Sequence, residues 1–180
     1  MPVPVVWSER DEPNSLRVYH CGECSGLMAL IFGGKVNFAR GIYSIAEREA
    51  LKAAENTPDH SGSTLQDVQG AVHRRYGLDV HIKEPADLAR YLDTPGYALL
   101  LQGKNGNLPP GDTLRRWDRA FSGNHAVCIL TSGPTVSTVL WLDPEAPWRY
   151  KGQRVTKAKV KAWSAGLGHF IPVKAGQFTA

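Results

Sequence analysis

The residues best suited to chemistry lie at positions 19–30, Tyr-His-Cys-Gly-Glu-Cys-Ser-Gly-Leu-Met-Ala-Leu. Cys21 is followed by helix-forming residues, so its thiol is expected where a helix begins and backbone N–H groups are unpaired. Such a position stabilises the thiolate, which is the nucleophilic form of cysteine. A thiolate that performs acyl transfer also needs a base and a third group that orients the base.

One pair later in the sequence meets that need. Residues 124–130 resemble a buried strand that carries His125, residues 131–135 have turn chemistry, and residues 136–143 resemble a second strand that ends at Asp143. The numbers of facing residues in an antiparallel hairpin have a constant sum, so a turn centred on Pro134 predicts that His125 lies directly opposite Asp143. The sequence therefore predicts an imidazole and a carboxylate on one side of a sheet.

Length and composition favour one globular domain. The 180 residues are 42% hydrophobic and 21% charged, and we expect a single domain over 1–180 whose residues 1–18 are irregular. The sequence has no apolar run of the roughly 20 residues that span a bilayer. Its first residues lack the basic start and apolar middle of a secretory signal. These features predict a cytoplasmic protein, or one carried inside a virus particle, with no membrane contact.

The net charge and the number of cysteines limit the kinds of partner that are expected for this chain. The net charge is +4 with three cysteines, too few for a disulfide framework. Six basic residues between positions 149 and 161 are accompanied by no groove-binding motif, so we interpret them as a solvated face and expect no nucleic acid partner. These are Arg149, Lys151, Arg154, Lys157, Lys159 and Lys161.

Hydrophobic periodicity, caps and breakers predict the other elements. Helices are predicted at about 22–32, 44–56, 63–77, 85–92 and 156–165, the second with a capping box of Ser44 and Glu47. Strands are predicted at 78–82, 97–102 and 169–173, the last at a sheet edge because of Pro172. Helices come first and strands later, which indicates an α+β domain with N-terminal helices packed on an antiparallel sheet.

The three motifs resemble those of papain-like cysteine peptidases, and within that fold the bacteriocin-processing type. In that group a Cys-Gly is followed, seven residues after the cysteine, by Met-Ala-Leu, as in Cys21-Gly22 and Met28-Ala29-Leu30. A His-hydrophobic-hydrophobic strand and an Asp-Pro after the next strand complete the pattern, as in His125-Ala126-Val127 and Asp143-Pro144. The resemblance covers about residues 15–173 and implies a papain-like fold.

The resemblance implies a cysteine peptidase or amide hydrolase without a cofactor. Cys21 would attack the carbonyl, and its own backbone N–H together with Asn14 would form the oxyanion hole. Asn14 stands where the family usually has a glutamine. His125 would protonate the leaving amine, and Asp143 would fix the imidazole tautomer.

Two further features bear on the nucleophile. Cys24 is the alternative nucleophile, because Cys-Gly-Glu-Cys also resembles the papain motif in which the second cysteine reacts. The Met-Ala-Leu register and the upstream asparagine favour Cys21. Glu23 would oppose a nearby thiolate, so it is expected to point to solvent. Substrate-binding walls are expected from Trp117, Asn124 and Trp141, together with part of the loop 103–112.

A short papain-like domain of this kind resembles phage-encoded proteins. That context implies a cell-wall peptide hydrolase whose substrate is a peptide or protein, such as a peptidoglycan peptide. The rival function is a papain-fold phage particle or binding protein without catalysis, which would have virion assembly partners. The missing glutamine favours the rival, and the intact cysteine, histidine and aspartate oppose it.

A zinc-binding module is the remaining alternative. It would use Cys21, Cys24, His125 and Cys128, which are ligand types that zinc prefers. However, His125 and Cys128 are three residues apart in a predicted strand, so their side chains would project to opposite faces. The spacing therefore disfavours a metal, and no metal site is predicted.

Overall fold

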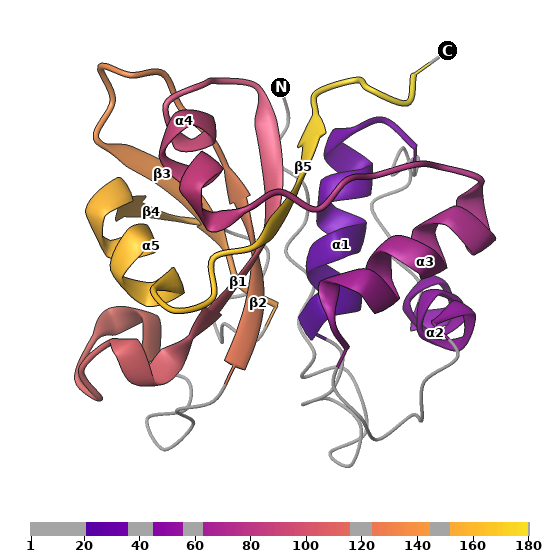
Figure 1. The fold of residues 1–180 in the computed structure, drawn as a ribbon, viewed down its shortest axis with the longest axis horizontal. Helices are drawn as coiled ribbons and strands as arrows, with labels where there is room; N and C mark the ends of the chain where they lie inside the picture. The colour runs from indigo at the N-terminus through magenta and orange to yellow at the C-terminus, as the bar shows by residue number, and fades with distance from the viewer. Residues whose placement is uncertain (1–20, 36–44, 56–62, 116–123, 145–151, 180) are drawn as a thin grey trace.

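A computed structural model describes residues 21–35, 45–55, 63–115, 124–144 and 152–179. Within these ranges an antiparallel five-stranded sheet has the order β4-β3-β2-β1-β5 (Figure 1). The strands are β1 (Tyr97–Lys104), β2 (Asn124–Leu130), β3 (Thr138–Leu142), β4 (Gln153–Thr156) and β5 (Phe170–Lys174). The helices are α1 (Cys21–Phe32), α2 (Ile45–Ala54), α3 (Leu65–Tyr76), α4 (Leu88–Leu92) and α5 (Lys157–Ser164). The predicted α+β arrangement, with N-terminal helices packed against an antiparallel sheet, is confirmed.

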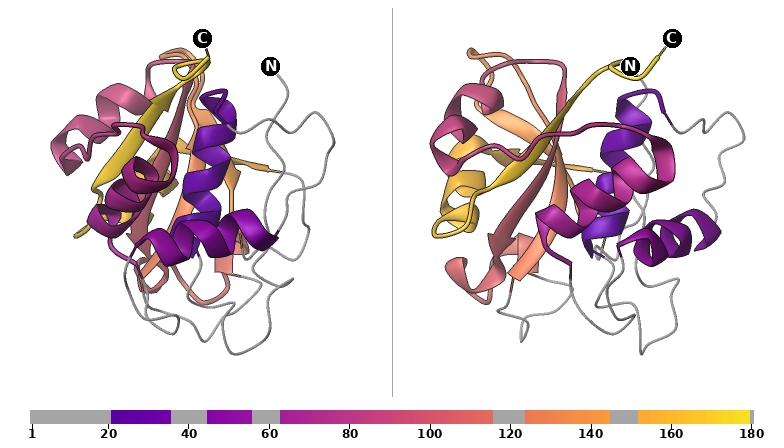
Figure 2. Two further views of the ribbon diagram at one scale, coloured as in Figure 1. Left: turned by 90° about the vertical axis from the view of Figure 1, so that its right-hand side faces the viewer. Right: turned by 45° about the vertical axis from the view of Figure 1, so that its right-hand side comes forward.

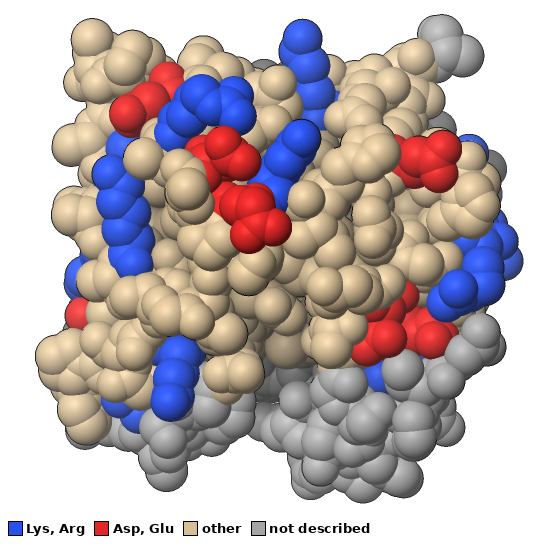
Figure 3. Space-filling model, in the orientation of Figure 1, with Lys and Arg blue, Asp and Glu red and all other residues tan. Residues whose placement is uncertain are grey.

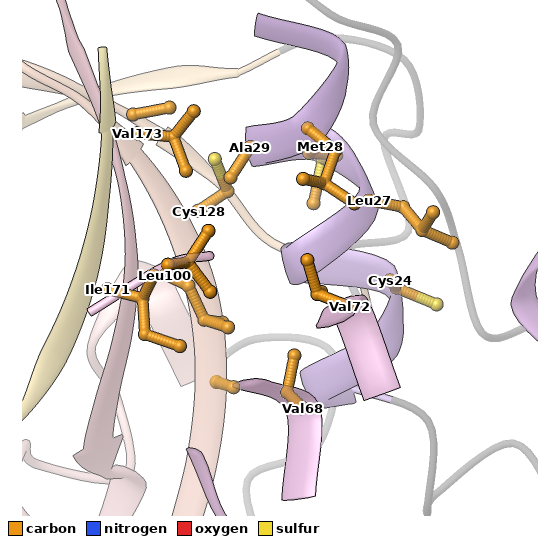
Figure 4. Packing of buried hydrophobic residues seen from close by; sticks show 14 of the residues in the cluster. Cys24, Leu27, Met28, Ala29, Val68, Val72, Leu100, Cys128, Ile171 and Val173 are labelled. Carbon is orange, nitrogen blue, oxygen red and sulfur yellow. The ribbon is translucent and has the colours of Figure 1, made fainter. Parts of the chain in front are cut away.

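Helices cover both faces of the sheet (Figures 1 and 2). On one face α1 packs against the sheet, with α2 and α3 beside it, and on the other face lie α4 and α5. Side chains alternate along a strand, so Leu100 enters the core under α1 whereas Leu99 and Leu101 enter the core under α5. Ala29 of α1 lies opposite Cys128 and Val173 of the strands in the first of these cores (Figure 4).

The helix boundaries follow local chemistry. Thr64 caps α3 by accepting from the Asp67 backbone N–H, and the Asp67 carboxylate accepts from the Thr64 N–H in return. Gly77 ends α3 with φ +66°, a conformation that glycine adopts without strain. The predicted ends of α1 and α3 are confirmed. In α2 the Glu47 carboxylate contacts Arg75 and Tyr76 of α3, and its predicted cap partner Ser44 lies outside the described residues.

One strand prediction was wrong, and one strand was not predicted. Residues 78–82 form no strand, and the chain there has only an isolated bridge between Lys83 and Phe170. Strand β4 was not predicted, because its four residues Gln153–Thr156 have a polar composition and bury only Val155. The predicted edge position of the last strand is confirmed, since β5 is the outermost strand beside β1.

The basic segment contains ion-paired lysines. Lys157 contacts Asp93 at 2.8 Å and Lys159 contacts Asp112 at 3.0 Å. On the face drawn in Figure 3, basic and acidic side chains are interspersed. Arg149 and Lys151 lie outside the described residues. Within the described ranges, no helix is long and apolar enough to cross a membrane.

Candidate active site

The starts of α1 and β2 lie at the same edge of the molecule, the lower edge in Figure 1. Cys21 is the first residue of α1 and is half-buried. His125 is the second residue of β2, and Asp143 directly follows β3. The fold therefore brings Cys21 to the same edge as His125 and Asp143, which lie more than 100 positions later in the sequence.

His125 and Asp143 form a buried pair. The His125 Nε2 atom lies 2.8 Å from Oδ1 of Asp143, and each side chain is 3% exposed. The predicted contact is confirmed, but the predicted register was wrong by two residues. The strands pair Cys128 with Leu142 and Leu130 with Leu140, which makes His125 and Asp143 diagonal neighbours. A shift of two residues keeps both side chains on the same face, so the contact forms across the diagonal.

The Cys21 side chain lies near the same imidazole ring, close enough to raise the pKa of His125. Burial alone would lower the pKa of His125, but the charge and hydrogen bond of Asp143, together with the Cys21 side chain, raise that pKa well above its ordinary value. Because Nε2 contacts Asp143, Nδ1 is the nitrogen that remains for the sulfur. An imidazolium held in this way can donate to a carboxylate and a thiolate at once.

Two tryptophans enclose the pair on the α5 side of the sheet. Trp141 donates from Nε1 to Oδ2 of Asp143 at 3.4 Å and packs edge-on against Trp163 at 4.8 Å between ring centroids. Trp163 also meets the His125 ring edge-on at 6.5 Å. Trp141 is 2% exposed, so its predicted role in substrate binding was wrong. It supports Asp143 from inside the core instead.

Trp163 was missed by the sequence analysis. Gly103 pairs with His125 across β1 and β2, and a Cβ atom at Gly103 would overlap the Trp163 ring. The indole therefore fills the space of an absent side chain next to the histidine. A glycine inside an apolar strand is a signal for such a close approach, but its partner depends on the register.

The positions of the other two cysteines favour Cys21 as the nucleophile. Cys24 is fully buried, and its side chain projects from α1 away from the sheet that carries His125 (Figure 4). Cys128 is also fully buried, and burial raises the pKa of its thiol. A buried neutral thiol is a poor nucleophile. Cys21 is the more accessible of the three.

The four residues of the zinc alternative do not converge. Cys24 and Cys128 lie on different sides of α1 (Figure 4), and His125 belongs to the other face of β2. Within the described ranges, no three His, Cys, Asp or Glu side chains are arranged to hold a metal ion. The zinc alternative is therefore not supported by the geometry of these residues.

A second ionic cluster surrounds Glu23, which was wrongly predicted to point to solvent. Glu23 is 0% exposed. Its Oε1 atom accepts from Ser63 at 2.7 Å and lies 3.5 Å from the Lys52 ammonium. Oε2 of Glu55 lies within hydrogen-bond distance of the same Ser63 hydroxyl oxygen and 3.4 Å from the Lys52 ammonium. The lysine charge offsets the carboxylate near the helix start, which explains how the acid is tolerated two residues from Cys21.

The remaining predicted site residues are placed as follows. Asn124 is exposed at the start of β2, where it can meet a ligand. Asn14 and Trp117 lie outside the described residues. Part of the loop 103–112 is tied to α5, because Asn105 accepts from the Trp163 Nε1 group at 2.9 Å and Asn107 donates to the Trp163 carbonyl at 2.9 Å.

Comparison of the chain with protein-family models and with curated proteins finds no match. The function is therefore inferred from the side chains and their geometry.

Proposed function

We propose that this chain is a cysteine hydrolase of the papain-like type that cleaves amide bonds through Cys21, His125 and Asp143. The observation that carries the proposal is the buried His125–Asp143 pair, 2.8 Å apart, with the half-buried Cys21 side chain close enough to raise the pKa of the same ring. A nucleophile, a base and an acid that orients the base are the parts that nucleophilic acyl transfer requires.

The first half of the reaction forms an acyl-enzyme. The raised pKa of His125 favours an imidazolium at neutral pH, which stabilises a thiolate at Cys21. The sulfur adds to the substrate carbonyl carbon, and the carbonyl electron pair moves to oxygen. His125 then gives its proton to the leaving nitrogen, the C–N bond breaks, and an amine departs, leaving a thioester on Cys21.

Water completes the cycle. The neutral imidazole takes a proton from water, the hydroxide oxygen adds to the thioester carbon, and collapse of the tetrahedral intermediate releases a carboxylic acid and the Cys21 thiolate. Asp143 holds the Nε2–H group throughout, so Nδ1 faces the sulfur and the substrate. In this mechanism the backbone N–H of Cys21, the first residue of α1, donates to the oxyanion.

The proposed substrate is a peptide bond, with peptidoglycan peptides of a phage host as the first candidates. The peptide bond follows from the family resemblance of the three motifs, and the phage context follows from the resemblance of a short papain-like domain to phage-encoded proteins. Two surface hollows lie elsewhere on the described part of the chain, one lined by α4, α5 and residues 165–169 and one beside α3, and neither is lined by Cys21 or His125. The hollows therefore do not define the substrate.

The test is selective alkylation followed by cleavage assays. The full chain is treated with iodoacetamide at pH 7, and the labelled cysteine is identified by peptide mapping. We expect Cys21 to react much faster than Cys24 and Cys128, which are both fully buried. Purified peptidoglycan and a mixed peptide library are then incubated with the chain, and new amino groups are identified by mass spectrometry.

The Cys21→Ala variant is the control, and it should remove both the fast labelling and any cleavage. Equal and slow labelling of the three cysteines would contradict the proposal and favour the rival, a papain-fold particle or binding protein without catalysis. Fast labelling of Cys24 in place of Cys21 would overturn the assignment of the nucleophile.

A further inference from the structure

Ser25 makes a direct connection between the cysteine helix and the histidine strand. Its hydroxyl group donates to the Ala126 carbonyl oxygen at 3.1 Å, and the side chain is fully buried. Ser25 lies four residues after Cys21, so the two side chains share one face of α1, one turn apart. Ala126 directly follows His125. The bond therefore joins the two segments that carry the sulfur and the imidazole.

The bond is unusual for a helical serine. Serine hydroxyls inside helices commonly bond to a carbonyl of their own preceding turn. Ser164 in α5 does so, donating to the Lys161 carbonyl at 3.3 Å. Ser25 instead reaches a different element 101 residues away. A buried hydroxyl without a partner would be destabilising, so this bond holds α1 at one position against β2.

The segment that Ser25 contacts has few other supports on one side. Strand β2 pairs with β1 from Asn124 to Leu130. Among the described residues, its pairing with β3 covers Cys128 to Leu130 alone. The start of β2, which carries His125, therefore extends beyond the β3 ladder. On that side the Asp143 contact and the Ser25 bond locate it.

We propose that Ser25 is a positioning residue: its bond to Ala126 sets the height and rotation of α1 so that the Cys21 sulfur meets Nδ1 of His125. This inference rests on the proposed cysteine hydrolase function. Ser25 touches neither substrate nor sulfur in the reaction and acts through the distance between α1 and β2. Loss of the hydroxyl group would loosen the sulfur–imidazole contact and leave the His125–Asp143 pair in place.

The experiment measures the alkylation rate of Cys21 by iodoacetamide in the full chain between pH 5.5 and 9, alongside the free energy of unfolding. For Ser25→Ala we expect a rate at pH 6 about fivefold lower than wild type, the factor to which the net strength of one hydrogen bond corresponds. The midpoint of the pH profile should rise as well. Ser164→Ala is the matched control, because that serine is also buried and bonds inside its own helix; its profile should equal wild type.

A second pair of variants removes the dependence on one substitution. Ser25→Thr and Ser25→Val have the same shape and differ in the hydroxyl group, so any effect of the added bulk is shared. Ser25→Thr should keep more of the low-pH reactivity than Ser25→Val. Equal profiles in these two variants, or a Ser25→Ala chain that loses stability while its pH profile stays at wild type, would overturn the inference.

The same data separate this inference from the proposed function. Wild type that shows no fast, His125-dependent alkylation of Cys21 contradicts the proposed function, and the inference is overturned with it. Wild type with fast Cys21 labelling that His125→Ala removes, combined with an unchanged Ser25→Ala profile, overturns the inference alone.

Discussion

The first turn of α1 contacts two buried ionic clusters of opposite design. Toward the sheet, Cys21 meets the His125–Asp143 pair. Toward α2 and α3, Glu23 meets a cluster made by Lys52, Glu55 and Ser63. We call the first the sheet cluster and the second the helix cluster. The acids and bases of both clusters are almost fully removed from solvent, so the different charge states of these groups come from the balance of acids and bases.

In the sheet cluster the described acid and base are matched. Asp143 faces one imidazole, and the pKa of His125 is raised despite burial. The raised pKa favours an ion pair between the Asp143 carboxylate and the His125 imidazolium. In the helix cluster two carboxylates surround one described ammonium group. Burial and the neighbouring Glu23 raise the pKa of Glu55 to about 8, so one carboxyl keeps its proton at neutral pH.

The two clusters also differ in whether they can do chemistry. The sheet cluster includes a half-buried sulfur that a substrate can approach. The helix cluster consists of side chains that are at most 4% exposed, apart from Ser63, and it contains no thiol. We therefore expect substitutions in the sheet cluster to change reactivity, and substitutions in the helix cluster to change stability and its pH dependence.

The largest effect is expected for Asp143→Asn. The substitution keeps the shape and removes the charge that holds the imidazole tautomer, and such a change in a triad lowers turnover on the order of 10⁴-fold. Peptide cleavage and Cys21 alkylation at pH 7 measure it.

Asp79→Asn is the matched control. Asp79 pairs with His73 at 2.9 Å, but both side chains are more than half exposed. It should leave the alkylation rate unchanged. An Asp143→Asn chain that reacts like wild type would remove the carboxylate from the proposed mechanism.

The next effect is expected for Lys52→Met in the helix cluster. Removing one partner of a buried ion pair destabilises a protein by about 3–5 kcal/mol, because the remaining charge is left uncompensated. Denaturant unfolding at pH 7 measures the loss, which should be smaller at pH 5, where the carboxyl groups can hold protons. Lys104→Met, at an exposed position, is the control and should change stability little. A Lys52→Met chain as stable as wild type would contradict the assigned role.

Gly103→Ala tests the packing behind the sheet cluster. A Cβ atom there would overlap Trp163, which meets the His125 ring edge-on, and overpacking of this kind destabilises by about 1–3 kcal/mol. Gly111→Ala is the control, since a Cβ at that position meets nothing within 4 Å. The thermal unfolding midpoint and the Cys21 alkylation rate should both change in Gly103→Ala. Neither should change in Gly111→Ala.

The smallest effect is expected for Glu55→Gln. It is a change in the slope of the free energy of unfolding against pH. The folded chain keeps the Glu55 proton where the unfolded chain has lost it, so this group lowers the free energy of unfolding as the pH rises from 4.5 to about 8. The raised pKa of His125 acts in the same direction, but only above its ordinary value of 6.5. Glu55→Gln should therefore flatten the stability profile between pH 4.5 and 6.5. Denaturant unfolding at several pH values measures this, and an unchanged slope would contradict the raised pKa of Glu55.

The His125–Asp143 pair of the sheet cluster could be predicted from the sequence because it depends on the spacing within one hairpin. Whether two residues of a hairpin share a face depends on even or odd spacing, so the His125–Asp143 contact survived a register that was wrong by two. The first and third helices were predicted for a similar reason, since Thr64, Gly77 and the glycines after Phe32 act within a few residues.

The helix cluster could not be predicted in the same way. Glu23, Lys52 and Ser63 come from three separate segments, and each would be an ordinary surface residue in its own helix or loop. The roles of Trp141 and Trp163 also depend on which strands are neighbours. A polar serine in an otherwise apolar helix is a local signal for the Ser25 bond, but the sequence does not name its partner.

The central claim is that Cys21, His125 and Asp143 act as one coupled unit. Nuclear magnetic resonance of ¹⁵N-labelled histidine measures this directly, with the His125 signals assigned by a His125→Asn variant. If the three residues are coupled, the His125 ring stays protonated on both nitrogens above pH 7, and its titration midpoint falls in Cys21→Ala. A ring that titrates near pH 6.5, with a midpoint unmoved by the loss of the Cys21 thiol, would contradict the account.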